Sequence, residues 1–185
     1  MERKSISMPV GIVVRKTPGV TRWAKWAWKA VAVLPGASPA DWRELRRDGD
    51  AVEYHAGTLP LELYRTDTEA YITALANDPP SVYVVMVEVE GGEFPIKLHL
   101  VTASAFEAQD YQDSGEEIVE PVPMPAGLIA WVREWVEFHH VEERFVKRRR
   151  DKKNIDMSED GIGDERIRQT ADVYRSPRSK KRTLQ

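Results

Sequence analysis

Apolar and polar residues alternate through most of the first hundred positions, and this pattern predicts β-strands. Apolar side chains recur at every second position from Phe94 to Leu100, which would bury one face of an extended strand. The segments that read as strands are 9–14, 28–34, 52–55, 59–64, 81–90 and 94–102. Gly91 and Gly92 separate the last two, and such a pair predicts a tight turn between antiparallel neighbours.

Three further residues indicate how these strands are arranged. Trp26 lies two positions before Trp28, and the two rings share a face only if the chain is extended there, which favours a strand over a helix. Gly57 predicts a bulge or a turn between two strands. Pro60 lacks an N–H group and therefore points to a sheet edge.

Helical spacing appears in three places. Thr66 and Glu69 have the spacing of a capping box, Ser104 opens a second helix that Gly115 closes, and Pro125 stands in the first turn of a third and longest helix. The stripe expected to face the core of this third helix comprises Leu128, Trp131, Val132, Trp135, Phe138 and Val141 or Glu142. The expected fold is α+β, an antiparallel sheet or partly closed barrel with three helices, the longest C-terminal.

The pattern of apolar positions stops at residue 147. Residues 147–185 carry thirteen Lys/Arg and seven Asp/Glu, a net charge of +6, so residues 1–146 carry −3 − 6 = −9. Low hydrophobicity and many charges of both signs are typical of segments that stay disordered. We therefore expect a single α+β domain over 1–146, followed by a disordered basic tail over 147–185.

The chain contains no cysteine. This excludes disulfides, thiolate catalysis, cysteine-ligated zinc, iron–sulfur clusters and persulfide transfer. The first residues are charged and reach Pro9 without an apolar stretch, and the longest apolar run, 82–87, is far shorter than the roughly 20 residues that span a membrane. We expect a cytoplasmic protein without a membrane span.

The tryptophans are the first candidates for a binding surface. Trp23 and Trp26 stand near Lys25 and Lys29, and aromatic rings between lysines suit contact with a partner or stacking with bases. The alternative is that each ring fills the core, and the sequence leaves Trp23 and Trp26 open between the two. Trp131 and Trp135 lie one helical turn apart on the expected inner stripe, which favours the core for both.

The histidines offer a weak metal pattern. His139 and Glu143 have the i, i+4 spacing of two ligands on one helix face. His140 points about 100° away, so a third ligand would have to come from His55 or His99. The simpler interpretation is that one of His139 and His140 packs against the domain and the other faces solvent. We therefore expect no metal site and no cofactor.

The carboxylates are dense around the end of the second helix. Buried acids with separated pKa values could perform general acid–base catalysis, but a solvated acidic surface is the ordinary arrangement at a helix end. The residues are Glu107, Asp110, Asp113, Glu116, Glu117 and Glu120. No nucleotide-binding glycine loop or nucleophile elbow is present, and we expect no catalytic residues.

The tail carries two basic clusters that suit an acidic protein surface or nucleic acid. A tail without a specific partner is the other interpretation. The basic residues expected to contact a partner are Lys147, Arg148, Arg149, Arg150, Lys180, Lys181 and Arg182.

Several segments together resemble one protein family. The segments 28–36, 55–63, 77–85, 101–111, 114–120 and 145–148 are similar to the proteobacterial family called domain of unknown function 3305. The resemblance covers residues 9–150 and omits the tail. Members of that family are typically encoded beside molybdenum-dependent formate dehydrogenases and their maturation factors, which implies a role in assembling or regulating such an enzyme. It implies no catalytic residues.

These observations lead to two hypotheses about function. The first is a non-catalytic cytoplasmic accessory protein for a molybdenum-dependent formate dehydrogenase, which contacts a subunit or a maturation factor through Trp23, Trp26 and the basic tail. The absence of thiols leaves holding, docking or cofactor-protecting roles. The alternative is a small nucleic-acid-binding protein that uses the same tail. The sequence also leaves open a ligand-binding or enzymatic domain whose pocket is invisible to sequence reading.

Overall fold

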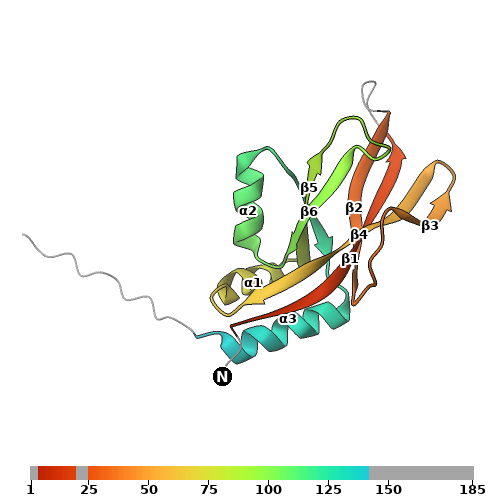
Figure 1. The fold of residues 1–185 in the computed structure, drawn as a ribbon. Coiled ribbons are helices and arrows are strands. Elements are labelled where there is room, and N and C mark those ends of the chain that lie inside the picture. Colours follow the sequence, from red (N-terminus) through yellow and green to blue (C-terminus); the bar gives the residue numbers. More distant parts are fainter. Residues whose placement is uncertain (1–3, 20–24, 142–185) are drawn as a thin grey trace, which may run out of the picture. The chain divides into compact units, whose positions relative to one another are not determined.

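Two antiparallel sheets form the centre of the fold (Figure 1). The computed structural model describes residues 4–19 and 25–141. The strands are β1 (Ser5–Pro18), β2 (Trp26–Pro35), β3 (Arg43–Asp48), β4 (Ala51–Tyr64), β5 (Ser81–Glu88), β6 (Ile96–Thr102) and β7 (Ile118–Pro123). The helices are α1 (Thr68–Leu75), α2 (Ala105–Ser114) and α3 (Ala126–His139). The expected α+β class is confirmed, with three helices of which the C-terminal one is longest. The sheets do not close into a barrel.

The larger sheet has the strand order β2-β1-β4-β3. Ile12, at the centre of β1, pairs with Val33 of β2 and Gly57 of β4 and is fully buried. The next residue of β1 pairs with His55, so Ala56 is the extra residue of a β-bulge beside Gly57. The two strands expected over 52–55 and 59–64 are therefore one continuous strand, because the bulge lets β4 bend without ending.

The second half of β4 lies at an edge, as Pro60 predicts. Among the described residues, β3 pairs only with the first half of β4, from Ala51 to His55. Pro60 pairs with Pro9 of β1, whose carbonyl accepts a hydrogen bond from Gly36 on the opposite side. The polar groups of Pro60 consequently point away from β1, toward the free edge.

The smaller sheet has the strand order β6-β5-β7. The tight turn expected at Gly91 and Gly92 is wrong in length, because β5 ends at Glu88 and β6 begins only at Ile96. Gly91 does adopt a positive φ of +80°, which glycine tolerates best. At their edges β2 lies against β7 and β4 lies against β6 without forming a ladder, so the core lies between two open sheets.

The helices begin and end largely as their sequence signals predict. The Ser104 side chain accepts a hydrogen bond from the Glu107 amide at the start of α2, and Gly115 ends that helix with a φ of +70°. The capping box expected at the first helix is wrong. Asp67 is the residue before α1, it makes no side-chain cap, and Thr66 donates to its carboxylate instead.

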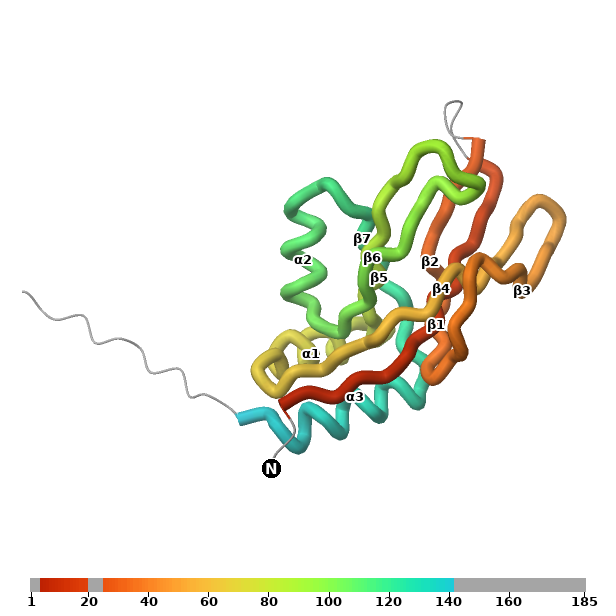
Figure 2. Tube along the Cα trace, viewed as in Figure 1, coloured from red at the N-terminus to blue at the C-terminus, as the bar shows by residue number. Residues whose placement is uncertain are grey.

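The longest helix packs one stripe against the core and lies side by side with α1 (Figures 1 and 2). Its buried residues are Leu128, Val132, Trp135 and Val136, and Trp131 is half-buried against them. Phe138 was expected on this stripe, but it is 74% exposed. At about 100° per residue, Phe138 falls roughly 100° from the centre of the buried stripe, and His139 falls on it.

Candidate functional site

Most of the predicted contact residues lie outside the described part of the chain. Trp23 and the basic residues Lys147, Arg148, Arg149, Arg150, Lys180, Lys181 and Arg182 are among them, as is the predicted domain boundary at residue 147. Trp26 is described and half-buried at the start of β2. The Lys16 ammonium lies 4.2 Å from the centroid of the Trp26 ring and 5.4 Å from that of Trp28, the geometry of a cation–π contact.

Trp28 belongs to a group of four aromatic residues that are far apart in the sequence but lie in contact in the structure. They are Trp28 of β2, Trp42 before β3, Tyr54 of β4 and Phe94 before β6, and we call them the aromatic cluster. The Trp42 and Phe94 rings stack with centroids 4.0 Å apart and planes 4° from parallel. Trp28 meets both of these rings edge-on, at 87° and 84°. All four are half-buried, so the cluster links the larger sheet to the β5–β6 connection while part of it reaches the surface.

Trp42 has a strained backbone. Its φ is +43°, in a region that bulky side chains rarely occupy and that costs about 1–3 kcal/mol. Its amide donates to the Ala56 carbonyl at 3.4 Å, and its ring stacks on Phe94. Strain of this kind persists only where the surroundings impose it, and it concentrates at functional sites.

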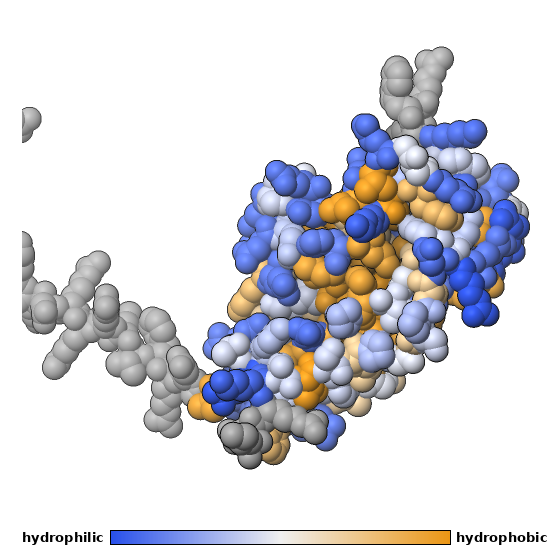
Figure 3. Space-filling view, in the orientation of Figure 1, coloured by the Kyte–Doolittle hydropathy of each residue, from blue (hydrophilic) through white to orange (hydrophobic). Residues whose placement is uncertain are grey.

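A groove opens beside Trp42 and Phe94, and we call it the aromatic groove. It has a volume of about 480 Å³ and runs between the segment before β3, the bulged part of β4 and the β5–β6 connection. Its lining residues are Ala40, Asp41, Trp42, Ala56, Gly57, Thr58, Leu59, Val89, Gly92, Glu93, Phe94, Ile96, Lys97 and Leu98. Eight of the lining residues are apolar, and the charged ones are Asp41, Glu93 and Lys97. Figure 3 shows hydrophobic residues through the middle of this face with hydrophilic residues at its margins.

Two hydrogen bonds that run from the buried His55 through Thr58 to Ser38 hold the segment that carries Trp42. The Thr58 hydroxyl donates to the Ser38 carbonyl at 2.8 Å, and it lies 3.0 Å from Nε2 of His55, which is 7% exposed. Because the single hydroxyl proton goes to Ser38, Nε2 of His55 must be the donor in its contact with Thr58. Gly11 lies directly against His55 and leaves the space that its ring needs.

The remaining histidines do not converge. His139 packs its ring 3.9 Å from that of Trp135, and Nδ1 of His140 lies 3.0 Å from the Thr68 hydroxyl. His99 contacts Tyr111 and is exposed. Glu143, the other half of the proposed metal pair, lies outside the described residues, and within the described ranges no group of three His, Asp or Glu side chains could hold a metal ion.

The carboxylates around the second helix separate in the structure. Glu107 and Asp110 lie on α2, whereas Glu120 lies on β7, where its carboxylate is 3.7 Å from the Lys29 ammonium of β2. Glu120 thus contributes to the edge where the two sheets meet and not to a helix-end cluster. Neither 4–19 nor 25–141 contains a helix long and apolar enough to cross a membrane.

No local pattern in the sequence points to the aromatic groove. Trp42 stands apart from the other aromatic residues along the chain, and Phe94 and Leu98 belong to the alternating face of an expected strand. Only the pairing of β4 with β1 and the approach of β4 to β6 bring these residues together.

Comparisons with known proteins give one match. No curated protein and no solved structure matches the chain. A family model described as "Protein of unknown function (DUF3305)" matches residues 9–149, which include nearly all the described residues and the whole aromatic groove. The chain belongs to this DUF3305 family.

Proposed function

We propose that this protein is a non-catalytic accessory factor that binds a protein partner through the aromatic groove. The observation that carries this proposal is the position of Trp42, whose strained backbone holds its ring in the wall of an open, apolar groove. Half-buried tryptophan and leucine side chains in such a groove are suited to contact a partner's apolar side chain.

The shape and lining of the groove favour a protein partner over a small polar metabolite. Its lining includes Leu59, Ile96 and Leu98, and only three of its lining residues are charged. An apolar centre with a polar rim is the usual anatomy of a protein–protein contact. Trp26 and the basic residues of the tail remain the further contacts that we predict for the same partner.

The proposed partner is a subunit or a maturation factor of a molybdenum-dependent formate dehydrogenase. This part of the proposal rests on the genes that typically accompany the family. The lack of cysteine favours holding, docking or protecting the enzyme or its cofactor over sulfur transfer. The proposed location is the cytoplasm.

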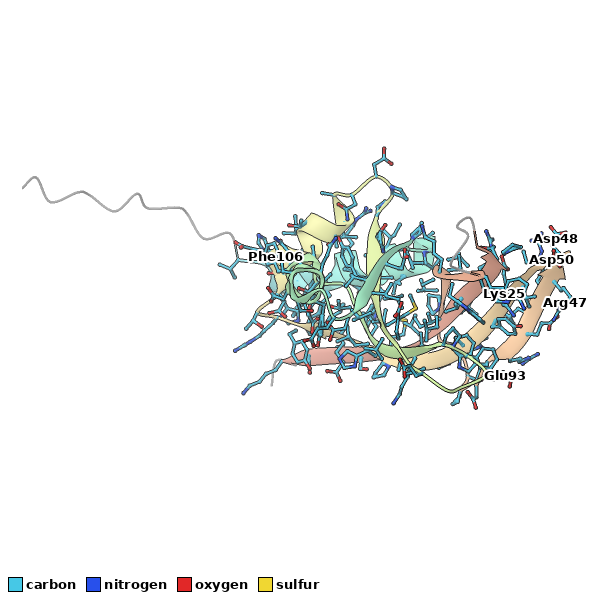
Figure 4. All side chains as sticks on the ribbon, turned by 90° about the horizontal axis from the view of Figure 1, so that it is seen from above. Lys25, Arg47, Asp48, Asp50, Glu93 and Phe106 are labelled. Carbon is cyan, nitrogen blue, oxygen red and sulfur yellow. The ribbon has the colours of Figure 1, made fainter. Side chains whose placement is uncertain are left out.

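A pull-down from native lysate, followed by mass spectrometry, tests the partner and the groove together. The full chain should capture a formate dehydrogenase subunit or maturation factor, and Asp41→Lys at the groove should reduce that capture. Asp50→Lys is the matched control, because Asp50 is also an exposed aspartate but lies in the β3–β4 turn, outside the groove (Figure 4). Equal capture by both variants would reject the groove as the partner site.

Deletion of the gene tests the cellular role. Formate dehydrogenase activity should fall while its transcripts stay constant, and the wild-type protein should restore the activity. A fall in the transcripts, together with salt-dependent binding of the purified protein to DNA or RNA, would favour the nucleic-acid alternative. Unchanged activity and a pull-down without any subunit or maturation factor would reject the accessory role.

A further inference from the structure

We propose that two copies of this chain pair through the free edge of β3 and thereby join their larger sheets into one. β3 (Arg43–Asp48) is the last strand in the order β2-β1-β4-β3, and within the described residues it forms a ladder with β4 alone. All six of its residues are exposed. Figure 1 shows this strand at the margin of the domain, on the side away from α2. The surface is separate from the aromatic groove, because no β3 residue lines that groove.

The turn between β3 and β4 determines which backbone groups of β3 face outward. The strands are joined by two residues, 49–50, and the residues that flank such a turn exchange both of their backbone hydrogen bonds. From there every second residue of β4 bonds to β3 in the same way, and Val52 and Tyr54 are the residues in between. Their partners are Arg47 and Glu44, whose N–H and C=O groups therefore point to the free edge.

These two outward-facing residues allow three symmetric antiparallel registers between two copies. Glu44 can face Glu44 of the second copy, Arg47 can face Arg47, or Glu44 can face Arg47 on both sides of the symmetry axis. The first two registers place like charges directly opposite each other, which destabilises paired strands, and each uses only one outward-facing residue per strand. The third register joins opposite charges and uses both residues. It alone satisfies the charges and the backbone together.

The rest of the strand agrees with the third register. Arg43 falls opposite Asp48 of the second copy at both ends of the paired segment. With the two pairs of Glu44 and Arg47, four cross-strand pairs join opposite charges and none joins like charges. An edge strand ordinarily uses its charges to repel other strands. The charges of β3 are instead complementary to their own reversed order, which favours a second copy of this chain as the occupant.

Leu45 lies at the centre of this edge. It is the extra residue of a β-bulge, because Glu44 pairs with Tyr54 whereas Arg46 pairs with the neighbouring Glu53. A bulge disturbs pairing with a regular strand, but two copies carry it at the same place, so their outward-facing residues keep the same spacing. The Leu45 side chain is 45% exposed. In the proposed pair it lies beside the symmetry axis, where it covers the aliphatic part of Arg46 of the second copy.

The contacts within one chain leave these charges available to a second copy. The Arg47 guanidinium donates to both carboxylate oxygens of Glu44, at 3.0 and 2.7 Å, and pairing would place a second such ion pair alongside. The Asp48 carboxylate lies 3.8 Å from the Arg46 guanidinium, and both side chains are largely exposed. Arg43 has no ion pair within the described ranges. The two end pairs therefore form without breaking a buried contact.

The paired surface is small, so we expect a reversible dimer that dissociates on dilution. β3 contributes six residues from each copy, whereas stable interfaces take about 20–30 residues a side. Exposed ion pairs each contribute little. The net charge of −3 on each chain also opposes association at low ionic strength. These terms predict a concentration-dependent equilibrium between monomer and dimer.

Sedimentation equilibrium of the full chain, in a concentration series that reaches millimolar, tests this proposal. The average mass should rise from that of the monomer toward that of the dimer. Arg43→Glu and Asp48→Lys each turn two attractive cross-strand pairs into repulsive ones, so each should raise the dissociation constant at least about tenfold. An equimolar mixture of the two variants should dimerise again, because the substituted positions then face each other with opposite charges. The double variant should associate with itself for the same reason.

Two controls and a second readout locate the contact. Arg133→Glu on α3 and Asp113→Lys on α2 change the same charges at exposed positions, on helices that Figure 1 shows apart from β3, and both variants should dimerise as the wild type does. The amide protons of Glu44 and Arg47 should exchange with solvent more slowly as the concentration of the wild type rises, because pairing places both in backbone hydrogen bonds.

Three outcomes would overturn the proposal. The first is a chain that stays monomeric throughout the series. The second is a dimer that survives both substitutions, which would form through another surface. The third is a pair of variants that associate neither alone nor with each other, which would reject the register. If the chain is monomeric and both substitutions also abolish capture in the lysate pull-down, the edge binds a strand of another protein and self-pairing is rejected.

Discussion

Replacement of Gly11 by alanine should disturb the contact between His55 and Thr58, a lining residue of the aromatic groove. A Cβ atom at this position would lie 2.5 Å from Nε2 of His55 and 2.9 Å from the Cβ of Ala37. Gly11 is buried in the middle of β1, where the backbone is paired on both sides. Neither the strand nor its neighbours can move aside without breaking that pairing.

The expected cost follows from two effects. Overpacking by one methyl group typically costs about 1–3 kcal/mol. Displacement of the His55 ring would also break its contact with Thr58, which adds about 1 kcal/mol for a lost hydrogen bond. We therefore expect Gly11→Ala to lower the free energy of unfolding by about 2–4 kcal/mol.

Urea denaturation followed by tryptophan fluorescence measures this loss, provided the slope of the transition is unchanged. Gly127→Ala is the matched control, because a Cβ there meets nothing within 4 Å and alanine favours the helix. That variant should be as stable as the wild type or slightly more stable. The double variant Gly11→Ala/His55→Ala should lose less than the sum of the two single losses, because truncating the histidine removes the closest overlap.

Two results would refute this reasoning. If Gly11→Ala changes stability by less than about 0.5 kcal/mol, the overlap is relieved without cost and the packing around His55 is looser than the contacts indicate. If the two substitutions are additive, His55 is not what the new methyl group meets.

Three further predictions concern the core, the tail and a buried tyrosine. Trp135→Ala should cost about 3–5 kcal/mol in urea denaturation, whereas Trp26→Ala should cost far less, because Trp135 is 7% exposed and Trp26 is half-buried. Truncation after Val146 should move the denaturation midpoint little, because contacts between solvent-exposed charges contribute roughly 0–1 kcal/mol; a large loss would mean that the tail packs as part of the core. Burial raises the pKa of Tyr71 to about 12, so the folded state keeps a proton that the unfolded chain releases near pH 10. The stabilisation linked to Tyr71 is therefore present below pH 10 and is lost as the pH rises toward 12. Tyr71→Phe should flatten the dependence of the unfolding free energy on pH in this range. An unchanged dependence would contradict the raised pKa of Tyr71.

The sequence predicted the elements whose burial leaves a periodic pattern. The burial of Leu128, Val132 and Trp135 on α3 and the cap at Ser104 follow from local patterns, and both are confirmed. The predicted burial of Phe138 is wrong. A spacing of three or four residues does not match the helical repeat of 3.6 residues, so ten residues after Leu128 the side chain no longer lies on the buried face. A stripe read from its first residue alone therefore becomes unreliable near the end of a long helix.

Two strands, β3 and β7, were not predicted, because neither shows a regular alternation of buried and exposed residues. All six residues of β3 are exposed, and the strand is held by its pairing with β4 and by ion pairs such as Arg47 with Glu44 at 2.7 Å. Pro121 and Pro123 have a low strand propensity, so β7 is not evident from the sequence, although it pairs with β5 along its whole length. The groove was missed for a related reason, since no local pattern predicts that Trp42 and Phe94 will stack.

The free half of β4 limits how this surface can associate with other chains. An exposed strand edge is ordinarily a template on which a foreign strand, or a growing amyloid, can form backbone hydrogen bonds. Four residues of this half, Thr58, Pro60, Glu62 and Tyr64, direct their amide positions toward this edge. Pro60 has no N–H, and the N–H of Tyr64 already donates to the Tyr71 hydroxyl at 2.9 Å, which leaves Thr58 and Glu62, four residues apart. The edge therefore offers a foreign strand no continuous row of donors, which works against templated aggregation.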